Sequence, residues 1–123
     1  MDFDYSYLNK TDLGKFDFIF ALEIIEHLMN PLVFLEFVKS CLPDHGKVFL
    51  STPFLRPRFL WSKYHTTEYF PDKIEILANK AGFRVNRYRV KRIYDYRHAL
   101  AGIRLFFRAL WFDRIMFFEF TKQ

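Results

Sequence analysis

Two short apolar segments with a helical pattern between them organise the first half of the chain. Residues 16–22 (FDFIFAL) form an almost unbroken apolar run, as expected of a strand that is covered on both faces in a parallel sheet. The pair Asn30-Pro31 then supplies a helix N-cap and a first-turn proline, and apolar residues recur at helical spacing as far as residue 42. Residues 47–52 (KVFLST) predict a second strand, stopped by Pro53. Strand, helix and strand with short connections predict a right-handed βαβ unit with parallel strands.

The same alternation of strands and helices continues in the second half. A helix is predicted over residues 71–81, ended by Gly82. Residues 83–93 predict a third strand, but the parity of its apolar residues changes after Val85, which indicates a bulge or a two-sided strand. Residues 98–112 are expected to be helical, and residues 115–121 to form a last, aromatic strand. The order predicts an α/β fold.

Length and composition fit one domain. The 123 residues, of which 51% are hydrophobic and 27% charged, exclude disorder and fibrous sequence. We expect residues 1–123 to form a single domain, with residues 95–114 as a lid or an amphipathic helix inserted in it. The lone Cys41 excludes a disulfide framework within the chain, and no apolar run is long enough to span a membrane. A cytoplasmic location is therefore predicted.

Charge is distributed unevenly along the chain. Residues 1–55 hold 4 Lys and Arg against 8 Asp and Glu, a net charge of −4, whereas residues 56–123 hold 15 against 6, a net charge of +9. A short basic segment carries much of the excess, with three tyrosines among its cations: Arg84, Arg87, Arg89, Lys91, Arg92 and Arg97. Such a mixture can follow the backbone of a nucleic acid or meet anionic lipid. The alternative, which we favour at this point, is a solvated edge strand whose charges prevent further pairing.

Several segments in order carry a family resemblance. They read FDFIFALEIIEHL, NPLVFLEFVKSCLPDHGKVFLSTP, WSKYHTTEYF and IEILANKAGFRV, and together they cover about residues 14–94. In this order they resemble the C-terminal half of class I S-adenosylmethionine-dependent methyltransferases, closest to the O-methyltransferases of the ubiquinone-biosynthesis type. The resemblance implies strands four to seven of a Rossmann-like sheet, with an antiparallel last strand. It also implies S-adenosyl-L-methionine as cofactor and methylation of a small molecule or another nucleophile, with oxygen as the expected acceptor atom.

The chain departs from this family in one respect. Relatives bind the cofactor chiefly through a glycine-rich loop after their first strand, and no Gly-x-Gly occurs anywhere in this sequence. We therefore expect a truncated domain: a shortened piece, an internal start, or a half-domain completed by a partner. Alone, this chain is expected to bind the cofactor weakly and to be inactive. An apolar sheet edge left open would favour self-association or a partner that completes the sheet.

Candidate site residues gather where the first two predicted strands end. Glu23, Glu26 and His27 have the spacing of one side of a helical turn at the carboxyl end of the first strand, where open α/β sheets place their sites. His65 follows the second strand and can return to the same edge. Two carboxylates and two imidazoles suit a divalent metal ion. The resemblance likewise implies Glu23, Glu26, His27 and His65 as metal ligands.

Other roles for these residues remain open. His27 and His65 could line the substrate pocket or act as catalytic general bases, because imidazole exchanges protons near neutral pH. A purely structural role is a third interpretation. The resemblance further implies that Ala21, Leu22 and Glu23 contact the cofactor. The alternative to an enzyme is a non-catalytic module whose basic half binds RNA, anionic lipid or a protein partner.

Overall fold

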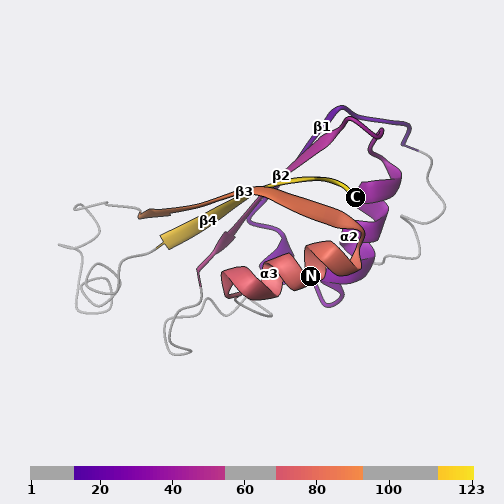
Figure 1. The fold of residues 1–123 in the computed structure, drawn as a ribbon. Helices are drawn as coiled ribbons and strands as arrows, with labels where there is room; N and C mark the ends of the chain where they lie inside the picture. Colours follow the sequence, from indigo (N-terminus) through magenta and orange to yellow (C-terminus); the bar gives the residue numbers. More distant parts are fainter. Residues whose placement is uncertain (1–12, 55–68, 93–113) are drawn as a thin grey trace, which may run out of the picture.

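The computed structural model describes residues 13–54, 69–92 and 114–123, and Figure 1 draws the other residues as a grey trace. The predicted helix at 98–112, the insertion at 95–114 and His65 fall outside this description, apart from Arg114. The elements, in chain order, are β1 (Phe18–Leu22), the 3₁₀ turn η1 (Ile25–His27), α2 (Pro31–Ser40), β2 (Lys47–Pro53), α3 (Pro71–Lys80), β3 (Phe83–Arg92) and β4 (Arg114–Lys122).

The strands form one sheet in the order β1-β2-β4-β3. β1 and β2 are parallel neighbours, with Phe18 opposite Lys47 and Leu22 opposite Ser51, which confirms the predicted pairing of the first two strands. β4 lies antiparallel between β2 and β3, as predicted for the last strand. The partial Rossmann-like α/β fold is therefore confirmed.

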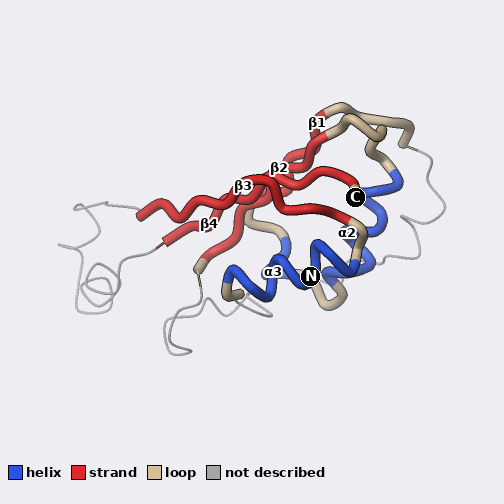
Figure 2. The backbone as a smooth tube through the Cα atoms, in the orientation of Figure 1, coloured by secondary structure: helices blue, strands red, loops and turns tan. Residues whose placement is uncertain are grey.

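Local sequence explains both helices, which lie on the same side of the sheet (Figure 2). Asn30 caps α2 by accepting a hydrogen bond from the Val33 backbone N–H at 3.3 Å, and Pro31 occupies the first turn, where its missing N–H is not needed. α3 also begins with a proline and ends before Gly82, whose φ of +82° suits a residue without a side chain. None of the described helices is long and apolar enough to cross a membrane.

The core lies between these helices and the sheet. Leu35 of α2 and Ile74 of α3 are fully buried, and they belong to one cluster with alternate residues of the central strands. Those strand residues include Val48, Leu50 and Phe120. The helix face of the sheet therefore supplies the apolar burial that stabilises the domain.

One prediction about the strands needs correction. β1 is not covered on both faces within the described residues: Phe18 and Phe20, on the side away from the helices, are 61% and 64% exposed. β2 does end at Pro53, and this proline is its last residue, paired with Ile115 of β4. Just beyond it, the Phe54 backbone N–H donates to the Arg114 carbonyl oxygen at 2.9 Å.

The change of parity in the third strand is confirmed as a bulge. The pairing of β3 with β4 shifts between Val85 and Arg87, so that Asn86 is the extra residue. Before the shift Arg84 lies opposite Thr121, and after it Arg87 lies opposite Glu119. β3 is an edge strand of the described sheet, as we favoured from its charges.

Candidate active site

The carboxyl ends of β1 and β2 lie side by side and carry the candidate site. Glu23 follows the last residue of β1, and its backbone N–H donates to the Ser51 carbonyl oxygen at 3.0 Å. The Ser51 hydroxyl donates to Glu23 Oε1 at 2.8 Å and lies 3.2 Å from the Glu23 backbone nitrogen. Ser51 therefore fixes both the backbone and the side chain of Glu23 at this edge of the sheet.

Glu23 adopts a backbone conformation that side chains other than glycine rarely take. Its φ is +52°, and it is the one non-glycine residue with a positive φ in the described part of the chain. This conformation costs about 1–2 kcal/mol for an L-amino acid. It persists because the contacts to Ser51 hold the turn, and strained residues of this kind cluster at functional sites.

Glu26 is a carboxyl group entirely removed from solvent, in the middle of η1. Its exposed fraction is 0%, and one of its oxygens, Oε2, accepts a hydrogen bond from the Thr52 hydroxyl at 3.1 Å. The other oxygen, Oε1, is buried and has no hydrogen-bond partner among the described residues. It lies 3.9 Å from Nε2 of His27, a side chain that is 36% exposed. A buried carboxyl oxygen thus faces the imidazole that meets the solvent.

Burial and nearby groups shift the pKa of this carboxyl group. Loss of solvation raises the pKa of Glu26 above its ordinary value, and the nearby charge of Glu23 raises it further. Hydrogen bonds from its own backbone and from Thr52, and the proximity of His27, oppose this rise but do not overcome it. A carboxyl group with a raised pKa in contact with a second ionisable side chain is a feature that clusters at functional sites.

The structure places the predicted cofactor contacts on and around the end of β1. Ala21 is 2% exposed and belongs to the core, whereas the side chain of Leu22 is 52% exposed on the opposite face. Glu23, which we predicted to share a helical turn with Glu26 and His27, instead precedes the three-residue turn η1. The sequence showed Ser51 and Thr52 as residues near the strand end, but did not reveal them as hydroxyl donors to the two carboxyl groups.

The predicted metal site is not supported by the described residues. Residues 13–54, 69–92 and 114–123 contain no group of three or more His, Cys, Asp or Glu side chains that could hold a metal ion. Glu23 and Glu26 each accept a hydrogen bond from a hydroxyl of β2. The fourth predicted ligand, His65, lies outside the described residues.

Comparison of the fold with solved structures finds methyltransferases. A methyltransferase from Bacillus halodurans, described as putative, matches with a TM-score of 0.68 and 9% sequence identity, over 94% of this chain and 68% of that one. An S-adenosylmethionine-dependent methyltransferase from Archaeoglobus fulgidus matches with a TM-score of 0.65 and 14% identity, over 96% and 64%. Magnesium protoporphyrin IX methyltransferase from Synechocystis, solved with bound S-adenosylmethionine, matches with a TM-score of 0.55 and 15% identity, over 94% and 43%.

These matches show a shared fold, and the chain spans less than half the length of the Synechocystis enzyme. A comparison with the sequences of curated proteins finds no match. The sequence model of one protein family, described as a methyltransferase domain, matches residues 4–100, which is most of the chain. With the strand order and the solved relatives in agreement, the chain belongs to the class I methyltransferase family.

Proposed function

We propose that this chain contributes to S-adenosylmethionine-dependent methyl transfer at the edge formed by the ends of β1 and β2, with a hydroxyl oxygen as the methyl acceptor. The observation that carries the proposal is the buried Glu26. One of its carboxyl oxygens has no hydrogen-bond partner in the described part of the chain and lies 3.9 Å from Nε2 of the half-exposed His27. This pair lies where open α/β sheets bind their ligands. Family membership supports methyl transfer in general, and the acceptor atom is our proposal.

The residues at this edge fit the proposed cofactor. When bound, S-adenosylmethionine supplies a methyl group on a positively charged sulfur, and it shares a cationic α-amino group with S-adenosylhomocysteine. The partly buried carboxylate of Glu23 is an anion beside the exposed end of β1, and it would suit that amino group in either ligand. Ala21 and Leu22 would contribute their backbone, as the resemblance implies.

His27 is proposed as the catalytic base. A hydroxyl group becomes a better nucleophile as its proton leaves, and a neutral imidazole nitrogen can take that proton. The adjacent carboxyl group of Glu26 would orient the neutral imidazole ring, or stabilise the imidazolium once the ring has taken up the proton. Glu26 is therefore proposed as a positioning residue. His65 remains a predicted second base.

The proposal is tested by titrating the isotope-labelled chain with S-adenosylhomocysteine and following backbone amide shifts by NMR, which detects weak binding. Weak binding is expected, because the chain contains no glycine-rich phosphate or nucleotide turn. The shifts should concentrate at Ala21–Glu23, His27 and Ser51–Thr52. The variant Glu23→Gln should weaken binding about tenfold, since a hydrogen bond to a charged group contributes about 1.5–3 kcal/mol.

The matched control is Glu36→Gln, which changes an exposed carboxylate in α2 and should leave the titration unchanged. Saturable shifts that map to β3 and β4 instead would contradict the proposed location. Equal weakening by the two variants would contradict the role of Glu23. If S-adenosylhomocysteine causes no shifts at its solubility limit, the cofactor assignment is wrong for this chain.

A further inference from the structure

The bulge in β3 gathers the basic residues of this strand on one face of the sheet. In a regular strand, Arg84 and Arg87, which are three residues apart, would point to opposite faces, because side chains alternate along a strand. The bulge shifts the pairing by one residue, so the cations all lie opposite odd-numbered residues of β4, which share one face of the sheet. The pairs are Arg84 with Thr121, Arg87 with Glu119, Arg89 with Phe117 and Lys91 with Ile115.

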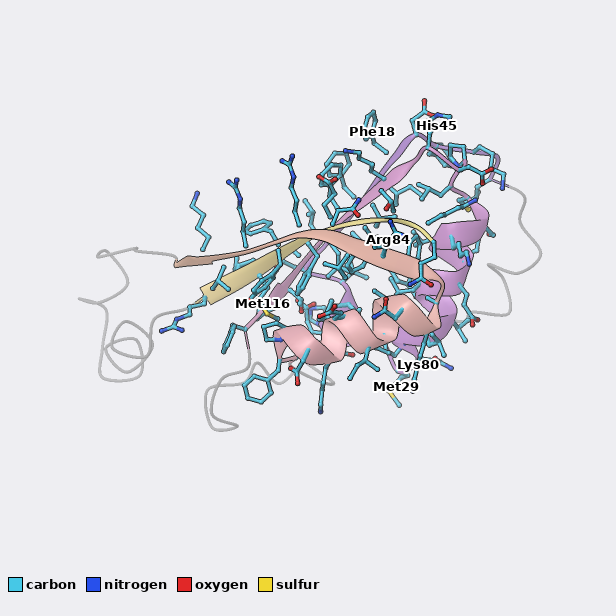
Figure 3. The ribbon with its side chains drawn as sticks, viewed as in Figure 1. Phe18, Met29, His45, Lys80, Arg84 and Met116 are labelled. Atoms are coloured by element: carbon cyan, nitrogen blue, oxygen red, sulfur yellow. The ribbon has the colours of Figure 1, made fainter. Side chains whose placement is uncertain are left out.

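This face is the one turned away from the helices. Phe118 and Phe120, the neighbours of Phe117 and Glu119, are buried in the core, so the alternate residues of β4 point outward. Figure 3 shows nitrogen-tipped side chains standing on the side of β3 away from α3, with Phe18 projecting from the same side of the sheet. Arg84, Arg87, Arg89 and Lys91 are all exposed.

An aromatic ring lies beside these cations on the same face. Phe117 is directly opposite Arg89 in the register and is 41% exposed. One acidic residue, Glu119, belongs to the strand pairs that form this row. It already forms a salt bridge with Lys47, whose Nζ lies 3.1 Å from its carboxylate. The row of cations on β3 therefore keeps an excess of positive charge next to an exposed ring.

We infer that this face binds a single-stranded nucleic acid. Alternate residues of a strand are about 6.6 Å apart, so Arg87, Arg89 and Lys91 form an evenly spaced row of charges, which Arg84 extends beyond the bulge. A row of cations follows a phosphodiester backbone, and an aromatic ring at its side provides a surface on which a base stacks. A basic amphipathic helix is the usual means of meeting a lipid surface, whereas a sheet face with cations and a ring in register favours nucleic acid.

This inference is independent of the proposed function, because binding needs neither the cofactor nor the residues at the end of β1. The test measures binding of fluorescein-labelled oligouridine and oligothymidine to the full chain by fluorescence anisotropy over a range of NaCl concentrations. Phosphate contacts contribute about 0.7 each to the slope of log affinity against log salt for single strands. The variant Arg87→Glu/Arg89→Glu should lower the magnitude of this slope by at least about 1.4.

Two matched controls separate this surface from general effects. Lys73→Glu/Lys80→Glu makes the same change of charge on exposed residues of α3 and should bind much more tightly than the β3 variant. Phe117→Ala should weaken binding about fivefold to 150-fold with an unchanged salt slope, as expected for one stacked base. Phe70→Ala removes a ring of similar exposure beside α3 and should bind like the wild type. Circular dichroism checks that each variant folds.

Several results would overturn the inference. One is binding of neither oligonucleotide by the wild type, and another is equal weakening by the β3 and α3 charge variants. A Phe117→Ala variant that binds as tightly as the wild type would reduce the face to a general polyanion surface. Binding to phosphatidylserine vesicles without binding to oligonucleotides would assign the face to membranes. A dimer in sedimentation experiments that is broken by Phe18→Ser and does not bind oligonucleotides would assign it to self-association.

Discussion

Glu26 is a carboxyl group that the fold removes from water at the edge of the sheet, where residues 13–54, 69–92 and 114–123 supply one hydroxyl partner for its two oxygens. Burying such a group costs free energy when it is ionised, and proteins seldom retain that cost without a use. Its neighbour His27 remains half exposed. The pair thus combines a group that is held in place with a group that can exchange a proton with a ligand.

This arrangement predicts how stability depends on pH. Because burial raises the pKa of Glu26 above its ordinary value of 4.5, the folded chain binds more protons than the unfolded chain above that pH. The contribution of Glu26 to the free energy of unfolding is therefore largest in acid, and it falls as the pH rises from about 4.5 to the folded pKa. The fall in the free energy of unfolding amounts to about 1.4 kcal/mol for each unit by which folding raises the pKa, and Glu26→Gln should remove it.

Urea unfolding at a series of pH values measures the effect. As the pH rises, the free energy of unfolding of Glu26→Gln should increase relative to that of the wild type. Glu36→Gln, on the exposed side of α2, should show no such change. Parallel pH curves for Glu26→Gln and the wild type would mean that Glu26 ionises in the folded chain as easily as in water.

Glu23 provides a second prediction at the level of a single residue. Glu23→Ala removes the hydrogen bond from Ser51 and keeps the strained backbone, so it should lower the free energy of unfolding by about 1 kcal/mol. Glu23→Gly removes the same hydrogen bond but relieves the strain at φ +52°, and it should be about 1 kcal/mol more stable than the alanine variant. Thermal unfolding of both variants tests this. An alanine variant that is more stable than the glycine variant would show that the backbone at residue 23 is not strained.

Among the elements, β3 has its one register shift at a single residue, Asn86. Deleting Asn86 would remove the bulge and leave Arg87 opposite Glu119, so regular alternation would keep Arg87, Arg89 and Lys91 on the face turned away from the core. We expect the deletion variant to fold with the same pairing. Asn86→Ala keeps the bulge and loses the exposed hydrogen bond to the Thr121 hydroxyl, at 3.0 Å, so it should cost at most about 1 kcal/mol.

Circular dichroism and soluble yield check that both variants fold. A deletion variant that does not fold would show that the pairing of β3 with β4 depends on the extra residue.

The elements were predictable because their signals are local. The N-cap at Asn30, the prolines at the starts of the helices and the parity change after Val85 each act within a few residues, and the structure confirms them. The site was predictable only in part. That Glu23 and Glu26 lie at the end of β1 follows from the βαβ pattern, but their hydroxyl partners follow from the register that places Leu22 opposite Ser51. No local signal in the sequence specifies that register.

Across the whole sheet, carboxyl groups and cations lie at opposite edges. Glu23 and Glu26 lie at the end of β1, and the cations lie along β3, with β2 and β4 between them. In the described part of the chain, the contrast between an acidic first half and a basic second half of the sequence thus becomes a contrast between the two edges of the sheet. The exposed face of β1 was not predictable, because an apolar run alone does not specify what covers it.

The central claim is that the ends of β1 and β2 form the place where S-adenosylmethionine binds. The most direct measurement is photocrosslinking of the full chain to methyl-tritiated S-adenosylmethionine, followed by tryptic peptide mapping. We predict label in the peptides of residues 16–39 and 48–58, which carry Glu23–His27 and Ser51–Thr52, and loss of that label with excess S-adenosylhomocysteine. Label confined to the peptides of β3 and β4, or label that excess S-adenosylhomocysteine does not displace, would contradict the account.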